Sequence, residues 1–272
     1  MLPDSLISLE KDSFYQCSSL NGVLHIPTGI TNWSASYVSM CENLTGFDVS
    51  PEHPSYCVED GILYSRDMTQ LIQCLSGKAG SVEIPEGVTV IGYQGLFNCK
   101  NITSLVFPSS LKVIEDYGCC ELTGLTETIT IPKALKYIGK NAFQNCKMLA
   151  DPLVIPAGVQ IGESAFFLCD NATTVIVEEG VTKLPAHAFG LSSIRAIYLP
   201  TSIEAIDEYC FNLIYDLRVY GCPGTAAEAF VNSAEGQGLR AVFYPMQMAD
   251  GYVLLERPIF RCLLQTITRQ AN

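Results

Sequence analysis

The stretch IPAGVQIGESAFFLC, residues 155–169, is one copy of a phrase that recurs along the chain. Regular copies start at positions 84, 107, 131, 155, 177 and 199, so successive starts are 23, 24, 24, 22 and 22 residues apart. Looser copies start at Leu2 and Ile26. A fixed period in this range predicts a solenoid, in which each coil buries its apolar face only against its neighbours.

Each position of the phrase has a structural role. Apolar residues that alternate up to Ile155 indicate a short parallel strand, and Pro156 ends it because proline cannot donate to the ladder. Gly158 allows the positive φ of a corner. We expect a short helical or 3-10 turn at Phe166, with Cys169 closing the coil. The phrase therefore predicts a right-handed, β-rich solenoid.

The chain contains twelve cysteines, and half of them follow a ring or apolar residue by three positions. A repeated cysteine in such a coil is expected to be a small buried hydrophobe. No C-x-x-C or H-E-x-x-H motif occurs, so we expect no metal site and no cofactor. The six cysteines assigned to this repeated position are Cys17, Cys41, Cys99, Cys120, Cys146 and Cys169.

One segment interrupts the period, because 35 residues separate Val49 from Ile84. Two alternating runs flank residues 65–69 and predict a β-hairpin insertion at about 57–75, lying outside the regular coil. Cys57 and Cys74 flank this hairpin, and the sequence leaves open whether they form a disulfide.

The C-terminal part departs from the phrase in a different way. Residues 221–245 read as a cap, with a helix beginning at Ala226, Thr225 as its N-cap and a final strand. We therefore divide the chain into a solenoid over residues 1–245 and a non-repeat tail over residues 246–272.

At these residues the sequence resembles the BspA-like class of bacterial leucine-rich repeats. The pattern I-P-x-x-V-x-x-I-G-x-x-A-F-x-x-C-x-x-L matches residues 131–149, the hairpin motif D-G-x-L-Y matches 60–64, and the cap motif G-x-P-G-S/T-x-A-E matches 221–228. The repeats near Phe189 and Phe211 depart from it by losing the cysteine. The resemblance implies an α/β leucine-rich repeat fold and a cell-surface or secreted binding protein, adhesin-like in some members.

The composition of the chain excludes two classes of partner. The chain carries 28 acidic and 16 basic residues, a formal net charge of −12, and lacks a Lys/Arg-rich run, so we expect no nucleic-acid binding. No uninterrupted apolar run of spanning length occurs, so we expect no transmembrane segment. The sequence opens in mid-repeat without a signal peptide, which suggests a piece of a longer protein or an early gene-model start.

Three acidic pairs are candidates for catalytic carboxylates, and two of them are better explained as a solvated turn. Two of the pairs occupy the same bend of the repeat, where a surface turn is expected. No nucleophile elbow, P-loop or G-x-G-x-x-G motif occurs, so we expect no enzyme activity and no catalytic residues. The pairs are Glu115-Asp116, Glu178-Glu179 and Asp207-Glu208.

The most informative surface is the outward side of the strands. If Leu105 and Phe107 point into the core, then Val106 points out, and the same alternation selects one residue in each coil. Exposed β-branched residues can reflect strand propensity alone, yet a stacked apolar row can also bind a ligand. The predicted row is Glu83, Val106, Thr130, Val154, Ile176, Tyr198 and Arg218.

The sequence therefore predicts a non-enzymatic binding module that engages a protein or glycan ligand. Two alternatives stay open. A polysaccharide-active enzyme on a parallel β-helix would have coils of similar length, and a structural spacer would need no ligand at all.

Overall fold

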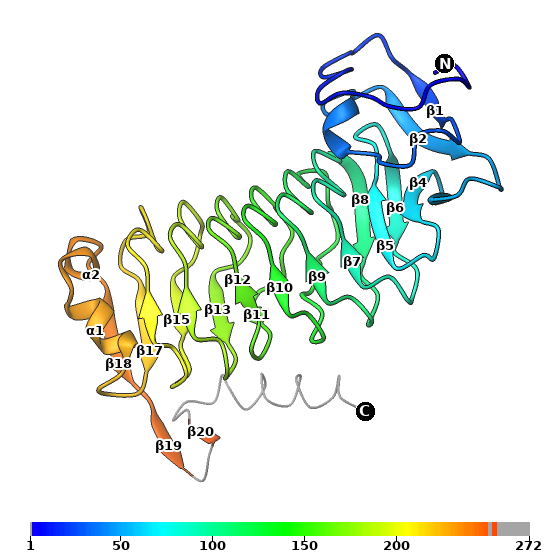
Figure 1. Cartoon of the computed structure of the whole chain (residues 1–272). Coiled ribbons are helices and arrows are strands. Elements are labelled where there is room, and N and C mark those ends of the chain that lie inside the picture. Colours follow the sequence, from blue (N-terminus) through cyan, green and yellow to red (C-terminus); the bar gives the residue numbers. More distant parts are fainter. Residues whose placement is uncertain (1, 250–251, 255–272) are drawn as a thin grey trace.

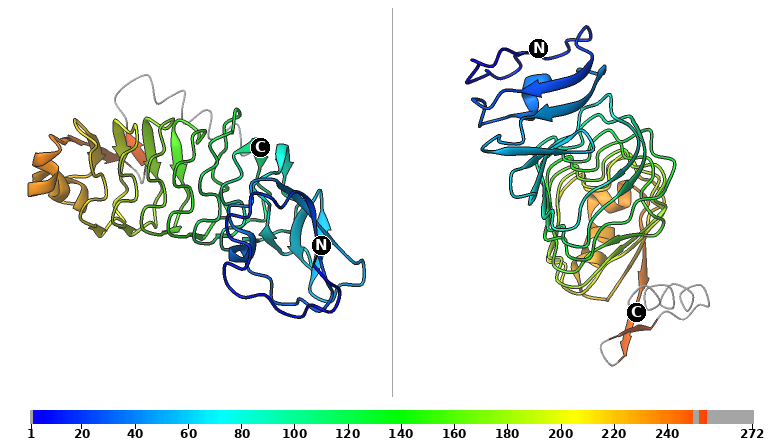
Figure 2. Two further views of the ribbon diagram at one scale, coloured as in Figure 1. Left: turned by 90° about the horizontal axis from the view of Figure 1, so that it is seen from above. Right: turned by 90° about the vertical axis from the view of Figure 1, so that its right-hand side faces the viewer.

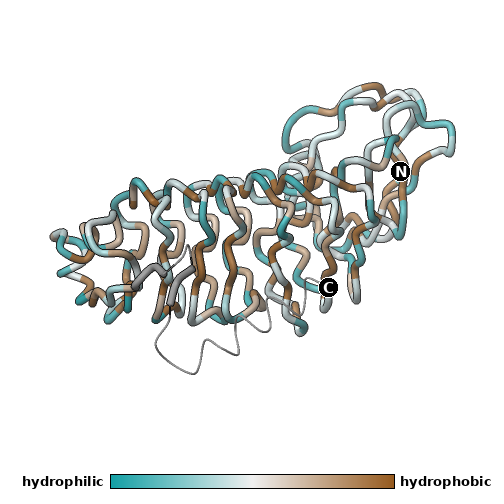
Figure 3. Tube along the Cα trace, turned by 90° about the horizontal axis from the view of Figure 1, so that it is seen from below, coloured by the Kyte–Doolittle hydropathy of each residue, from teal (hydrophilic) through white to brown (hydrophobic). Residues whose placement is uncertain are grey.

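The computed structural model describes residues 2–249 and 252–254, and it confirms the predicted solenoid. In the main solenoid the coils succeed one another along a single axis, with the C-terminal helices at one end (Figure 1). Apolar segments recur at the same place in coil after coil (Figure 3). No helix among the described residues is long and apolar enough to cross a bilayer.

The strands that precede the proline corner form parallel sheets on one side of the coils. Their neighbours in sequence are also their neighbours in space, as expected for a solenoid. Gly158 has a φ of 66° and makes the predicted corner. These strands are β1 (Gly22–Ile26), β2 (Leu44–Val49), β6 (Ala79–Glu83), β8 (Asn101–Val106), β11 (Leu153–Ile155), β13 (Thr174–Val177), β15 (Ala196–Tyr198), β17 (Arg218–Gly221) and β18 (Val242–Pro245).

A second ladder follows the proline corner, and in the regular coils each of its strands has only two residues. The inward residue of each pair is apolar and most of these side chains are buried, which holds this side of the coil to the core. These strands are β7 (Val90–Ile91), β9 (Val113–Ile114), β10 (Tyr137–Ile138), β12 (Gln160–Ile161), β14 (Lys183–Leu184) and β16 (Ala205–Ile206).

The ring-bearing turn closes each coil, and here the prediction of a helical turn is wrong for the regular repeats. Ser164 and Leu168 have φ angles of 55° and 60°, and such left-handed residues cannot continue a helix. Instead the turns bond to one another, as when the Phe166 amide donates to the Ala188 carbonyl at 2.8 Å. Within the described chain, a 3-10 helix is assigned only to η1 (Ala35–Val38).

The same turns correct the assignment of one repeated cysteine. Tyr117 and Glu121 have φ angles of 58° and 63°, so they correspond to the left-handed residues of the other turns. Cys119 therefore occupies the ring position, and its amide donates to the Ala142 carbonyl at 2.8 Å. Leu122 stands where a cysteine was predicted, and Cys120 lies between the two positions.

Phenylalanines from successive turns stack along the core. Phe143, Phe166 and Phe189 are fully buried, and their ring centroids are 5.5 Å apart with interplanar angles of 4° and 6°. Phe211 continues the stack at 5.8 Å and Phe230 ends it at 5.2 Å with a tilt of 59°. Phe230 belongs to the cap, so the cap closes the apolar core by completing this stack.

The hairpin is confirmed, but its predicted position outside the coil is wrong. Strands β3 (Tyr56–Glu59), β4 (Ile62–Ser65) and β5 (Gln70–Gln73) form an antiparallel meander. Strand β5 then pairs in parallel with β7, placing Leu71 beside Ile91. The meander is thus the first part of the second ladder rather than an appendage.

The meander also separates two hydrophobic cores. Ile62 and Tyr64 pack into the solenoid core, whereas Leu63 between them packs into an N-terminal core with Trp33 and Phe47. All three consecutive residues of β4 are nearly fully buried, because both faces of this strand are covered. In Figure 2 the N-terminal segment lies to one side of the solenoid axis.

The predicted cap is present as two short helices and a last strand. Helix α1 (Ala226–Asn232) begins after Thr225, whose hydroxyl donates to the Cys222 carbonyl at 2.6 Å and makes no capping bond. Ser233 does cap α2 (Ala234–Gly238), accepting from the Gly236 amide at 3.1 Å. Of the predicted tail, only the backbones of β19 (Gln247–Ala249) and β20 (Tyr252–Leu254) lie among the described elements.

Replacing Phe166 with alanine is expected to destabilise the protein by about 3–5 kcal/mol, because a fully buried ring leaves a cavity between two stacked neighbours. Urea denaturation followed by circular dichroism measures the change. Tyr137→Ala is the matched control, since this ring is 36% exposed and its loss should cost much less. Equal losses in the two variants would contradict the stacked core.

Acidification is expected to destabilise the protein through His53. Its buried Nδ1 accepts the amides of Ser55 and Tyr56 at 3.2 Å, so the proton sits on Nε2, which faces the Pro27 carbonyl at 3.3 Å. Burial lowers the pKa of His53, so the unfolded chain takes up a proton before the native state does. Stability should therefore fall as the pH drops below about 6.5, the ordinary histidine pKa.

Thermal denaturation at a series of pH values measures this effect. His53→Gln should remove most of the dependence in that range, whereas His25→Gln serves as the control because His25 is more exposed and lies beside Asp48. An unchanged pH profile in His53→Gln would refute the assignment.

Candidate ligand-binding surface

Part of the predicted outward row forms a continuous line. Val154 pairs with Ile176, and Ile176 pairs with Tyr198, across adjacent parallel strands. These three side chains are half-buried, while their strand neighbours Val175 and Ile197 are fully buried. The alternation inferred from the sequence therefore places these residues correctly on the outer face.

The N-terminal part of the row is separate. Glu83 pairs with Val106 on the two-stranded sheet of β6 and β8, and both side chains are exposed. Thr130 is exposed but lies outside any sheet, and hollows of about 620 and 230 Å³ lie on its two sides. In the described part of the chain, the strand pairing of this region with the next coil is limited to an isolated bridge between Ile129 and Leu149. The seven predicted residues are therefore not one strip.

Arg218 is misplaced in the predicted row. It lies on the outer face but pairs with Ala196, one pleat away from the line of Tyr198. The residue that pairs with Tyr198 is Tyr220, which in turn pairs with Tyr244 of the last strand. The line over the C-terminal coils therefore ends in three tyrosines, two of which the sequence analysis missed.

The three tyrosines, Tyr198, Tyr220 and Tyr244, form what we call the tyrosine ladder. Their centroids are 4.3 and 4.9 Å apart, with interplanar angles of 11° and 23°. The spacing matches that of neighbouring strands, so the rings stack because the backbone register brings them together. Stacking covers both faces of the middle ring, Tyr220, and one face each of Tyr198 and Tyr244.

The spacing of the tyrosines in the sequence could have revealed this ladder. Tyr220 follows Tyr198 by 22 residues, the spacing of the preceding coils, and Tyr244 follows Tyr220 by 24. The proline of this coil is displaced, because Gly221-Cys222-Pro223 replaces the usual Leu-Pro. Alternation alone selects the outer face, and the pairing register selects the residue on it.

Positive charge lies beside the tyrosine ladder. Burial raises the pKa of the Tyr198 phenol, the Tyr220 hydroxyl raises it further, and the nearby charge of Arg218 lowers it. Arg218 and Arg195 are exposed and line a hollow of about 450 Å³ at the starts of β15 and β17. This outer face therefore combines phenol and guanidinium groups, although the chain as a whole is acidic.

The acidic pairs hold adjacent coils together. The Glu115 carboxylate accepts the Tyr93 amide at 2.8 Å, and Glu179 accepts the Thr201 amide at 3.0 Å. Asp207 forms an ion pair with Lys183 at 2.8 Å. Among the described residues, no group of three or more His, Cys, Asp or Glu side chains is placed to hold a metal ion.

The two cysteines beside the meander have separate neighbours. The Cys57 thiol lies 3.2 Å from the Ser65 carbonyl and from the Met68 sulfur, and Cys74 packs beside Cys99 in the solenoid core. Both carry free thiols. Burial raises the pKa of the thiols of Cys119, Cys146 and Cys169, to about 12 for Cys146, so these three groups remain protonated at neutral pH.

Comparison with known proteins identifies the repeat. The family described as BspA type leucine rich repeat region matches in six copies, over residues 1–59, 74–159 and 150–245. None of the curated proteins matches the chain.

Three solved structures share the fold. The pneumococcal vaccine antigen PcpA superposes with a TM-score of 0.71 at 20% identity, covering 84% of this chain and 56% of that one. A leucine-rich repeat protein from Eubacterium ventriosum gives 0.63 at 24% identity, covering 72% and 53%. A leucine rich cell surface protein from Faecalibacterium prausnitzii gives 0.56 at 22% identity, covering 79% and 51%. The chain spans about half the length of these structures.

Among the cysteines of the described chain, only the half-buried Cys17 and Cys222 are expected to react quickly with iodoacetamide in the native state. Cys57 should react more slowly, because partial burial raises the pKa of its thiol. The buried thiols should react only after unfolding, because burial makes them inaccessible and also raises the pKa of thiols such as Cys119 and Cys169. Peptide mass spectrometry of the native and urea-unfolded protein locates the labels. Rapid native labelling of Cys146 or Cys169 would contradict the packing.

Proposed function

Because this chain belongs to the BspA-type leucine-rich repeat family, we propose that it is a non-enzymatic binding module of a surface or secreted bacterial protein. The ligand is a protein or a glycan, recognised in an adhesin-like manner. The chain spans only part of its structural relatives, so the proposal concerns this solenoid and not the activity of a whole protein.

The tyrosine ladder supports this proposal most directly. Tyr244 is 39% exposed, and its neighbours Val242 and Arg218 are also exposed on the same sheet face. Tyrosine and arginine are the residues that contribute most often to the centres of interfaces. The ladder is already ordered by stacking, so binding would not have to order its rings.

The chemistry of this face suits an oxygen-rich ligand. Phenol hydroxyls donate and accept hydrogen bonds, and guanidinium groups bind carboxylates and other anionic oxygens. Acidic glycans and acidic protein surfaces both present such oxygens. Val154 and Ile176 continue the row of the tyrosine ladder with apolar side chains, on which a sugar ring or an aliphatic side chain can pack.

An enzyme on this scaffold has less support. The carboxylates of Glu115, Glu179 and Asp207 are engaged in bonds between coils, which is a structural use of the acidic pairs. A glycosidase would need two carboxylates facing each other across a cleft. We therefore retain the binding module over the polysaccharide-active enzyme and the structural spacer.

Tyr220→Glu is expected to abolish ligand binding, or to weaken it at least about tenfold, because it removes the middle ring and adds a charge that repels anionic oxygens. The wild-type chain is first tested on an array of neutral and acidic glycans and of extracellular matrix proteins. Affinities for each positive ligand are then measured by biolayer interferometry.

Tyr137→Glu is the matched control, because it changes a partly exposed tyrosine of the second ladder, on another side of the coil. The control should bind as the wild type does. If Tyr220→Glu binds every positive ligand normally, the tyrosine ladder is not the binding face. If the wild-type chain binds nothing on the array, the binding module itself loses its support.

A further inference from the structure

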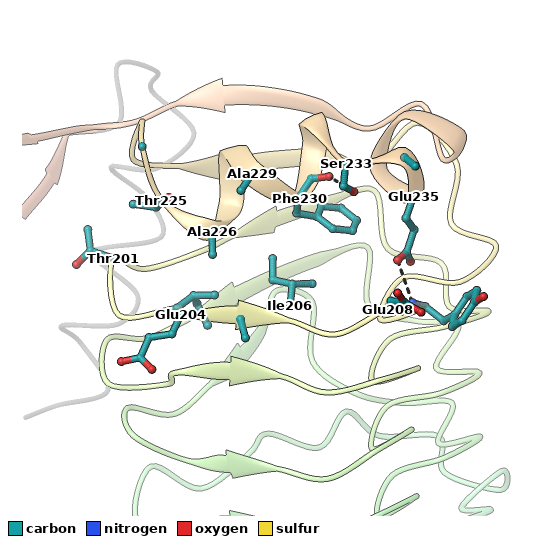
Figure 4. A pocket seen from close by; sticks show the side chains of 15 residues that line it. Thr201, Glu204, Ile206, Glu208, Thr225, Ala226, Ala229, Phe230, Ser233 and Glu235 are labelled. Atoms are coloured by element: carbon teal, nitrogen blue, oxygen red, sulfur yellow. Dashed lines mark hydrogen bonds between the residues drawn. The ribbon is translucent and has the colours of Figure 1, made fainter.

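A groove lies under the C-terminal cap, on the side of the second ladder and away from the tyrosine ladder. Helix α1 lies over strand β16, and the space between them opens to solvent with a volume of about 1160 Å³ (Figure 4). Ile206, Ala226, Ala229 and Phe230 line it with apolar surface. It is thus large enough for a short peptide segment and not only for a small ion.

Strand β16 has an unused hydrogen-bonding edge in this groove. On its other edge β16 pairs with β14 (Lys183–Leu184): the Leu184 carbonyl accepts the Asp207 amide at 2.9 Å, and Ile206 lies opposite Leu184 in the register. The amide and carbonyl of Ile206 therefore point to where the next coil would lie. Because α1 replaces that coil, β16 pairs only with β14 among the described strands.

The groove is negatively charged. Glu204 and Glu208 are exposed along its rim, and no lysine, arginine or histidine among the described residues lines it. Glu235 points into it from α2 (Figure 4), and one of its oxygens accepts the Tyr209 amide at 3.0 Å. The other oxygen is buried and has no hydrogen-bond partner among the described residues. Such a group is costly unless a donor reaches it.

We propose that this groove binds an extended, lysine- or arginine-rich peptide segment of a partner protein, which adds to β16 as a further strand. The backbone of the segment would bond to Ile206 and to the Glu204 carbonyl, the mode by which exposed sheet edges accept peptides. Alternate side chains would lie on the apolar surface of α1, and the basic residues between them would reach the exposed Glu204 and Glu208.

Charge selects this occupant over a second copy of the chain. The formal net charge is −12, so an edge-to-edge contact between two copies would bring like charges together around three glutamates. A basic segment instead removes the repulsion, because its side chains can pair with the exposed carboxylates of Glu204 and Glu208. This proposal is independent of the tyrosine ladder, which lies on the other sheet.

The test uses the whole chain and a fluorescein-labelled hexapeptide of alternating valine and lysine, followed by fluorescence anisotropy. Binding should be saturable and should weaken at least about tenfold in Glu204→Lys/Glu208→Lys. Glu42→Lys/Glu52→Lys is the matched control, because it makes the same charge change at exposed residues of the N-terminal part. The control should keep nearly the wild-type affinity. Tyr220→Glu should also keep it, which separates this site from the proposed ligand face.

Two further peptides test the mode of binding. A hexapeptide in which glutamate replaces lysine should not bind, because it adds negative charge to the groove. A valine–lysine hexapeptide with alternate backbone amides methylated should bind at least about tenfold more weakly, because one edge of its backbone can no longer donate. The proposal is overturned if the first hexapeptide fails to bind the wild type, if the double glutamate variant binds it normally, or if methylation has no effect.

Discussion

The structure depends on the hydrogen-bonded register between one coil and the next. Because parallel strands bond residue to corresponding residue, each coil places its side chains directly over those of its neighbour. The buried phenylalanine stack and the exposed tyrosine ladder are two results of this one constraint, inside and outside the same coils. Exposed ion pairs such as Lys140 with Glu163 follow the register too, although pairs of this kind add little stability. The backbone ladders and the apolar core therefore fix the shape, and the outer residues are free to differ from coil to coil.

The sequence predicts what repeats, and it predicts poorly what happens where the repeat changes. The strands, the proline corner and the outward positions of Val154, Ile176 and Tyr198 follow from a period that many copies support. Cys120 was misassigned because it follows Tyr117 by three residues, the usual ring-to-cysteine spacing. The left-handed residues Tyr117 and Glu121 show that the ring position is two residues later, at Cys119. Arg218 was misassigned because alternation defines a face without fixing the register on it. The groove under the cap could not be predicted, since it depends on how far α1 lies from β16.

The meander shows how one interruption changes the whole molecule. Ile62, Leu63 and Tyr64 are consecutive and all buried, a pattern that suits a strand covered on both faces and not an exposed hairpin. By giving one face to each core, β4 joins the N-terminal coils to the main solenoid without continuing their axis (Figure 2). Strand β4 thus belongs to both parts, and the buried His53 lies on its N-terminal side.

The C-terminal cap covers the end of the solenoid only in part. The last coil of a solenoid exposes an apolar core and also the unpaired edges of its strands, and a cap must cover both. Phe230 covers the core by completing the aromatic stack, and β18 extends the first ladder, whereas the short helix leaves the edge of β16 open. Charge then distinguishes the two surfaces near this end, since Arg218 adjoins the tyrosine ladder while glutamates rim the groove. An open edge surrounded by like charges resists pairing with another copy of the same acidic chain and still admits a strand of opposite charge. The open edge that the cap leaves would therefore favour a basic strand over a second copy of this chain.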